Sequence, residues 1–285
     1  ASGSTIYRGQ SSVLNGKFRA EFLIPKDISY ADSLAGGRLV GYFFNDNIDG
    51  AGFTTKISLS GADTGVAIDV KGPAIRLYLD SRSFRDGDLV GEHPMLFVDL
   101  ADSSGINTST SGVGHRIEAW INNSPKSKDL TEFYASKLDI YQEGTAQYQF
   151  RDLPKGRNSV RVRAWDTYNN ASTAETFFEV TSSNQLTISD VMNYPNPFAS
   201  ATAFTFRQNQ LVPLTVKIKI YTLAGRLIQT LENFSAGDPF IRVPWDGRDR
   251  DGDQIANGVY LYKVIVQTSD GRFSSESIGK LAVVR

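Results

Sequence analysis

Short runs of alternating apolar and polar residues recur along this chain, and they constrain its fold more than any other feature. The run Val160–Trp165 is typical, because Val160, Val162 and Ala164 share one face while arginines take the other. Clusters of Gly, Ser, Asn and Asp separate such runs, as expected for turns between strands. With 11% aromatic residues and 25 glycines in 285 residues, the composition also fits many short strands. We therefore predict an all-β protein of tandem immunoglobulin-like β-sandwich domains.

Lapses in this alternation divide the chain into three predicted domains. Residues 1–71 form a sandwich or partial sandwich, residues 72–182 an immunoglobulin-like sandwich, and residues 183–285 a third sandwich. The strands expected in the first domain are 6–13, 17–24, 38–44 and 53–59. Those expected in the second are 75–79, 95–100, 117–121, 146–150, 159–165 and 176–180.

Local signals refine this division. Asn15-Gly16 is a dipeptide that favours a tight hairpin turn. Residues 130–134 are either a strand or a short helical turn, and residues 181–185 look like a linker. Four strands make a thin sandwich, so the first domain is expected to belong to a larger one whose earlier strands precede this chain.

Charge and cysteine content exclude several classes of protein. The net charge is −1, from 30 basic and 31 acidic residues, so no field gathers nucleic acid or anionic lipid. No apolar run approaches the roughly 20 residues that span a bilayer, and Ala1–Thr5 lacks the basic and apolar regions of a signal peptide. We expect a soluble chain that lacks a nucleic-acid partner and a membrane span. The absence of cysteine excludes disulfides and thiolate catalysis, and no catalytic residue or cofactor is predicted.

The last third of the chain carries three motifs in a fixed order. Tyr194–Phe198 reads Tyr-Pro-Asn-Pro-Phe, and its prolines favour a stiff extended segment with an aromatic anchor at each end. Trp245–Asp249 opens an acidic loop, and Asn257–Tyr260 leads into a long alternating strand. In this order the motifs resemble the C-terminal sorting domain of type IX secretion. The resemblance implies a seven-stranded β-sandwich that carries a secreted protein across the outer membrane to the cell surface in Bacteroidetes-type bacteria.

A second resemblance covers the first and middle parts of the chain. Its segments are Tyr7–Gly9, Gly16–Phe18, Phe22–Asp27, Gly72–Leu79, Asp102–Thr108, Gly112–His115 and Ala164–Asn170. They resemble the region after the peptidase domain in the PorU-like sortases of type IX secretion, a gingipain-like cysteine peptidase family. This chain departs from the family because it lacks the nucleophilic cysteine. No catalytic residue carries over, and the peptidase domain is expected upstream.

The two resemblances together imply a location and a partner. The protein is expected to be secreted and held at the cell surface in association with the outer membrane. Its implied partner is an outer-membrane β-barrel protein of the type IX attachment complex, to which the retained sorting domain docks.

Two acidic loops allow two interpretations each. One loop carries four carboxylates: Asp246, Asp249, Asp251 and Asp253. Alternating carboxylates beside Gly252 are typical of a calcium loop, but the distal bidentate glutamate is absent, which favours a glycine-rich hairpin turn. The loop that holds Asp46, Asn47 and Asp49 has the same two interpretations, and a turn is again favoured.

Four Asx residues of the middle domain form the other candidate calcium site: Asp99, Asp102, Asn107 and Asp166. They lie near strand ends and could converge at one end of the sandwich, where immunoglobulin-like modules sometimes hold calcium. Asx side chains in β-loops also bond to their own backbone, so ordinary turns are the alternative.

The histidines and one basic cluster also have competing interpretations. His115 could be a ligand or base, but a structural hydrogen bond is favoured because the chain offers no nucleophile for it to activate. His93 is expected at an exposed strand end. The basic residues are Lys155, Arg157, Arg161 and Arg163. They could contact lipopolysaccharide phosphate, although a solvated strand face is favoured.

Three functions stay open. The first is the noncatalytic sorting and docking region of a cell-surface sortase. The second is a pair of spacer and sorting domains from another secreted surface enzyme or adhesin. The third is a subunit of an extracellular assembly whose sandwiches stack or exchange edge strands.

Overall fold

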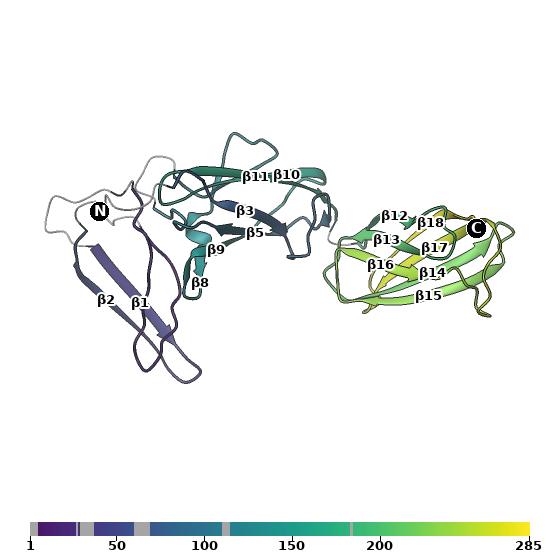
Figure 1. Cartoon of the computed structure of the whole chain (residues 1–285), viewed down its shortest axis with the longest axis horizontal. Coiled ribbons are helices and arrows are strands. Elements are labelled where there is room, and N and C mark those ends of the chain that lie inside the picture. The colour runs from purple at the N-terminus through teal and green to yellow at the C-terminus, as the bar shows by residue number, and fades with distance from the viewer. Residues whose placement is uncertain (1–4, 27, 29–36, 60–68, 110–114, 183–184) are drawn as a thin grey trace.

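The computed structural model describes residues 5–26, 28, 37–59, 69–109, 115–182 and 185–285. Strands dominate these ranges, and their one helical element is the 3₁₀ turn η1 (Thr131–Phe133). The protein is therefore all-β, as predicted. A hairpin, a central sandwich and a C-terminal sandwich follow one another along the long axis of the molecule (Figure 1).

The N-terminal part contributes a two-stranded sheet. Strands β1 (Gly37–Phe44) and β2 (Asp49–Ile57) pair with each other in antiparallel fashion and with no other strand of the described chain. The strand predicted at 38–44 is confirmed, and β2 begins earlier than the predicted 53–59. Two strands by themselves do not enclose a core, and these two form a ribbon within the described residues of 1–71. The domain boundaries themselves stay predictions.

The strands predicted at 6–13 and 17–24 were wrong. This segment is extended but pairs only through isolated bridges, such as Gln10 with Leu138. The turn at Asn15-Gly16 is confirmed, with φ angles of 51° and 72° and two backbone hydrogen bonds between Leu14 and Lys17. Turn chemistry is local, whereas a strand also needs a neighbour to accept its hydrogen bonds, and this segment has none along most of its length.

Two sheets form the central sandwich, with strand orders β3-β5-β9-β8 and β4-β11-β10-β6-β7. The bounds are β3 (Ala74–Leu79), β4 (Leu89–Val90), β5 (Met95–Ala101), β6 (Glu118–Ile121), β7 (Lys128–Asp129), β8 (Tyr134–Lys137), β9 (Ile140–Gln149), β10 (Gly156–Trp165) and β11 (Ala171–Val180). Each strand predicted for this part overlaps one of these, and the ambiguous segment 130–134 holds η1.

The alternation in the sequence explains the core between these sheets. Val160, Val162 and Ala164 of β10 are fully buried, while Leu96 and Val98 of β5 face them from the other sheet with no exposed surface. Each such apolar side chain contributes about 1.5–3 kcal/mol on burial. Register is therefore fixed by which face of each strand is apolar.

Seven strands form the C-terminal sandwich, in sheets ordered β12-β13-β16 and β15-β14-β17-β18. The bounds are β12 (Ile188–Tyr194), β13 (Thr202–Gln208), β14 (Leu214–Thr222), β15 (Leu227–Ser235), β16 (Phe240–Trp245), β17 (Gly258–Thr268) and β18 (Ser274–Val283). The number of strands agrees with the prediction.

Aromatic side chains fill the core of this second sandwich. Trp245 is 3% exposed, and its ring lies 5.6 Å from that of Phe198 and 6.2 Å from that of Phe204. Its indole N–H donates to the carbonyl of Arg248 at 2.9 Å. Phe198 is an anchor, as predicted, but Tyr194 is 76% exposed. The expectation of an anchor at both ends of 194–198 was therefore wrong for Tyr194.

Arg207 connects the two sandwiches. Arg207 of β13 places Nη1 3.1 Å from the carboxylate of Asp88 and donates to the carbonyl of Asp86 at 3.1 Å. Its Nε lies 3.2 Å from the carboxylate of Asp190. Asp88 is only 1% exposed, so this contact is a buried one between domains. Part of the predicted linker, residues 183–184, lies outside the described residues.

No helix within the described ranges has the length and apolar character that crossing a membrane requires.

Candidate metal site in the central sandwich

Three aspartates meet at one end of the central sandwich. The carboxylate oxygens of Asp69, Asp102 and Asp166 lie within 4.8 Å of one another. Asp69 precedes β3, Asp102 follows β5 and Asp166 follows β10. The pairing of β3 with β5 and the bridge between Ile106 and Asp166 bring these segments close together. Hydrogen bonds from the Ser103 and Asn170 side chains to Asp69 complete the approach.

Asp166 is the fixed member of this cluster, because it is fully buried. One carboxylate oxygen accepts the backbone N–H groups of Tyr168 at 2.9 Å and Asn170 at 2.7 Å, and the other accepts the Asn170 amide at 2.7 Å. These bonds close the turn between β10 and β11. They also hold the charge in one place and leave one lone pair free on the second oxygen.

Asp69 and Asp102 each accept two hydrogen bonds. Asp102 accepts the backbone N–H and the hydroxyl of Ser104, at 2.8 and 2.7 Å. Asp69 accepts the backbone N–H of Lys71 at 3.0 Å and the hydroxyl of Ser103 at 3.1 Å.

The electrostatics of the three carboxylates differ. Burial raises the pKa of Asp102, and the negative charges of Asp166 and Asp69 add to that effect. The backbone N–H of Lys71 lowers the pKa of Asp69. Within the described part of the chain, none of the three forms a salt bridge with Lys, Arg or His. The cluster therefore concentrates negative charge, which the nearby cation of Lys71 offsets in part at Asp69.

A hard divalent cation fits this donor set better than a transition metal. Calcium takes six to eight oxygen ligands at about 2.3–2.6 Å from carboxylates, carbonyls and water. Three carboxylates supply part of such a shell, and the Asp69 carbonyl, which accepts the Asn170 amide at 3.0 Å, lies beside it. Zinc prefers nitrogen and sulfur ligands, which the cluster does not offer.

The structure brings together only part of the set predicted from the sequence. Asp102 and Asp166 belong to the cluster. Asn107 instead accepts the backbone N–H of Ser109, and Asp99 was misplaced, because it pairs with Arg82 at 2.9 Å and accepts a hydrogen bond from Thr145. Asp69 was missed. The observation that places it is the β3–β5 register, because a residue that precedes β3 lies near the end of the antiparallel β5.

The acidic loop after Trp245 forms a turn. Asp249 accepts the backbone N–H groups of Asp251 and Asp253, each at 3.0 Å. Asp246 accepts that of Arg248 at 3.1 Å. No three of the four carboxylates in this described loop gather within 4.8 Å, since their geometry is that of Asx turns.

The loop between β1 and β2 has the same local character. Asn45 accepts the backbone N–H groups of Asn47 and Ile48, at 2.8 and 2.9 Å. Asp49 accepts the hydroxyl hydrogen of Tyr42 at 2.8 Å.

The histidines and basic residues lie away from the cluster's carboxylates. The ring of His115 packs 4.5 Å from that of Trp165, and His93 accepts the backbone N–H of Asp152. Arg161 and Arg163 both lie over Trp120, and Arg163 also pairs with Glu118 at 2.6 Å. Such stacking and pairing are typical of an outer strand face.

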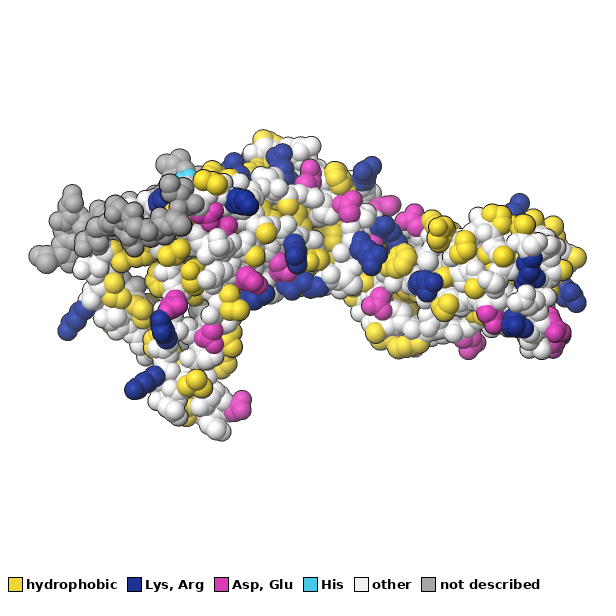
Figure 2. All heavy atoms as spheres, viewed as in Figure 1, with side chains coloured by type: hydrophobic (Ala, Val, Ile, Leu, Met, Phe, Trp, Pro, Cys, Tyr) yellow, Lys and Arg dark blue, Asp and Glu magenta, His cyan; other side chains and the backbone are white. Residues whose placement is uncertain are grey.

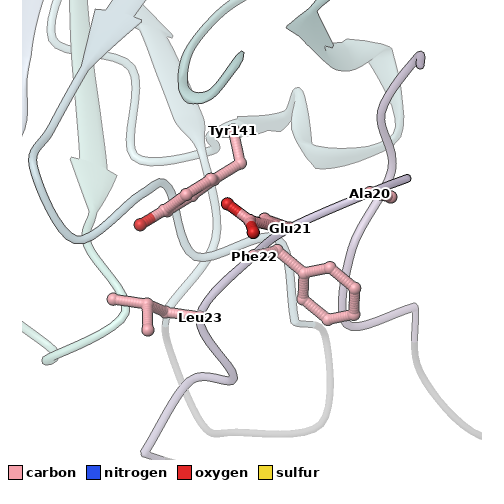
Figure 3. Close-up of a pocket in the computed structure, with 5 residues that line it drawn as sticks. All are labelled: Ala20, Glu21, Phe22, Leu23 and Tyr141. Atoms are coloured by element: carbon pink, nitrogen blue, oxygen red, sulfur yellow. The ribbon is translucent and has the colours of Figure 1, made fainter. Parts of the chain in front are cut away.

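A shallow cavity of 440 Å³ lies between the extended N-terminal segment and β9. Figure 3 shows its five labelled residues: Ala20, Glu21, Phe22, Leu23 and Tyr141. Glu21 pairs with Arg19, and these five residues offer no nucleophile beside a base. The cavity does not have the groups that hydrolytic chemistry requires.

Comparison with known proteins gives one informative similarity. No family model matches the sequence, and no curated protein matches it. PorU from Porphyromonas gingivalis, in a crystal structure of its dimeric latent form, is 29% identical over 95% of this chain, with a TM-score of 0.42. The chain spans 26% of that PorU chain. The chain therefore matches one region of a longer protein.

Two further solved structures share less with this chain. A β-glucuronidase from Parabacteroides merdae is 9% identical, covering 74% of this chain and 24% of its own, with a TM-score of 0.32. A tetra-tandem repeat from the extending region of a large adhesion protein is 14% identical, covering 82% and 52%, with a TM-score of 0.26. Likenesses this weak carry no argument about function.

Proposed function

We propose that this chain is the noncatalytic C-terminal region of a cell-surface, PorU-like sortase of type IX secretion. The observation that carries the proposal is the 29% identity to PorU along 95% of the chain. The chain contains no cysteine, so it cannot supply the thiolate of a cysteine peptidase. The catalytic residues of such a protein would lie in the part of the polypeptide outside this chain.

The role we propose for residues 186–285 is outer-membrane translocation and docking to a β-barrel partner. Support comes from how the three sorting motifs meet in space. Phe198 and Trp245 pack together in the core. Arg285 donates to the carbonyls of Ala199 and Ile255, and its backbone N–H donates to Asn257. Motifs separated by up to sixty residues thus form one end of a single folded unit.

Deletion of residues 186–285 from the parent protein tests this proposal. We expect the truncated protein to accumulate in the periplasm, measured by fractionation and by protease accessibility on intact cells. Leu138→Ser is the control, because Leu138 is 54% exposed in the central sandwich, outside the domain proposed to dock, and its substitution should leave display unchanged. Normal surface display of the truncated protein would refute the docking role.

The sequence that precedes this chain in its gene separates this proposal from the alternatives. A gingipain-like domain with a His and Cys pair supports the sortase. A glycosidase or adhesive repeat in that position would favour a spacer and sorting region of another secreted protein.

A further inference from the structure

The hairpin β1–β2 carries large hydrophobic side chains that nothing in the described chain covers. They are Leu39, Val40, Tyr42, Phe43, Phe44, Ile48 and Phe53, with exposed fractions between 43% and 76%. Strands β1 and β2 pack on each other, and no other described strand packs closely on them. Figure 2 shows hydrophobic side chains, in yellow, at the hairpin end of the molecule, opposite the C-terminal sandwich.

Cross-strand register sorts these residues onto two faces. Val40 lies opposite Phe53, Tyr42 opposite Ala51 and Phe44 opposite Asp49. Val40, Tyr42, Phe44 and Phe53 therefore form one continuous surface, which we call the aromatic face. The rings of Tyr42 and Phe44 stack 5.9 Å apart.

The opposite face combines glycines with two apolar side chains. Gly41 lies opposite Gly52, and a side chain on either would meet nothing within 4 Å. Phe43 lies over Gly50, where an added Cβ would come within 2.5 Å of the phenyl ring, and Leu39 lies on the same face. Both faces of the ribbon therefore carry apolar surface.

This pattern belongs to a strand that is covered on both sides. A ribbon with one solvated face alternates apolar and polar residues, whereas β1 is nearly continuously apolar, as strands buried on both faces are. A two-stranded hairpin is also marginally stable by itself. The three aromatic side chains of the aromatic face alone present on the order of 400 Å², comparable with the largest apolar patch on most monomers.

We infer that a domain of the same polypeptide, preceding residue 1, packs on the aromatic face of this hairpin. The inference rests on the proposed function, under which most of the protein precedes this chain. The PorU region that matches is 26% of that protein, so a polypeptide of similar length has ample chain to provide the cover. The uncovered hydrophobic residues Val13, Leu14 and Phe18 of the N-terminal segment lie in the same part of the sequence.

Charge at the two ends of the aromatic face defines the covering surface further. Arg38 lies 5.0 Å from the ring of Phe53 at one end, and Asp49 flanks Phe44 at the other. The covering surface is therefore apolar at its centre, with an acidic group near Arg38 and a basic group near Asp49. Asp46 and Asp49 at the tip disfavour an anionic lipid surface as the occupant.

Binding in trans tests the inference. The segment encoded immediately before residue 1 is purified and titrated against this chain by calorimetry. Phe44→Ser and Phe53→Ser should each weaken Kd by about tenfold or more, as central aromatic contacts do. Phe234→Ser is the matched control, because Phe234 is 63% exposed in the C-terminal sandwich and its loss should leave Kd unchanged. None of the three should change the melting temperature of this chain alone.

If the preceding segment and this chain do not associate as separate molecules, hydrogen exchange in the intact polypeptide tests the inference instead. Amides of residues 38–57 should exchange at least tenfold more slowly in the intact protein than in this chain alone. Equal exchange in both would overturn the inference. So would a dimer of this chain that Phe53→Ser dissociates, which would identify a second copy as the occupant, or hairpin-dependent binding to phosphatidylglycerol vesicles.

The inference and the proposed function fail separately. A preceding domain without a His and Cys pair sinks the sortase proposal but leaves the hairpin contact intact. If the preceding domain is gingipain-like and its Kd for this chain is unchanged by Phe44→Ser and Phe53→Ser, the sortase proposal is supported and the hairpin contact is overturned.

Discussion

Arg207→Ala should uncouple the central and C-terminal sandwiches. Arg207 is 25% exposed at its side chain and lies 3.1 Å from Asp88, which is 1% exposed. Removing the cation leaves a buried carboxylate with the backbone N–H of Arg85 as its remaining close partner. Breaking a buried ion pair in this way costs about 3–5 kcal/mol of unfolding free energy. Because water has partial access to Arg207, we expect a cost of about 3 kcal/mol.

Separation of the two sandwiches would hydrate Asp88 and so lower the loss of unfolding free energy in Arg207→Ala. The loss in unfolding free energy is therefore limited by the free energy of docking. Small-angle scattering should show a wider range of interdomain distances, and urea denaturation should show the less stable sandwich unfolding earlier. Unchanged scattering together with a loss below about 0.5 kcal/mol would refute the coupling.

Two control variants separate charge from packing. Asp190→Asn should cost under about 1 kcal/mol, because Asp190 is 60% exposed. Arg207→Met with Asp88→Leu removes both charges and should recover most of the lost stability.

The pH dependence of the same site has a definite sign. Burial raises the pKa of Asp88, and the charge of Arg207 opposes this shift. A carboxyl with a raised folded-state pKa favours folding below its ordinary value of 3.8, and that contribution is lost as pH rises through the folded pKa. Asp88→Asn should therefore flatten the stability profile in this window.

Three further predictions concern the sandwiches themselves. Trp245→Ala should lower the unfolding free energy of the C-terminal sandwich by about 3–5 kcal/mol in denaturant titration, because Trp245 is 3% exposed; an unchanged midpoint would mean that the side chain is not in the core. Calcium at about 10 mM should stabilise the central sandwich by about 1.4 kcal/mol if Kd is near 1 mM, and Asp166→Asn should abolish this effect while Asp99→Asn preserves it. Tyr134→Phe should be neutral or stabilising by up to about 1 kcal/mol in urea, since the buried Tyr134 hydroxyl has no partner in the described structure; a loss above 1 kcal/mol would indicate a hydrogen bond through water.

Local chemistry was readable from the sequence, and pairing between distant segments was not. The alternation of Val160–Trp165 predicted β10 because both sheet faces of a sandwich impose a period of two. The same period at 6–13 did not give a strand, since alternation shows which face could be buried but not whether a partner exists. The same limit applies to the candidate metal site. Asp102 and Asp166 follow strands that the alternation of apolar residues predicts, whereas Asp69 joins them through the β3–β5 register.

The residues that carry the sorting resemblance mostly explain stability and not recognition. Phe198 and Trp245 fill the core, and Asn257 holds the backbone of Arg285. The motif residues therefore make contacts inside the sandwich. Under the proposed docking role, a partner can contact only exposed side chains such as Tyr194, which is 76% exposed. We therefore expect substitutions at Trp245 to change folding and substitutions at Tyr194 to change docking.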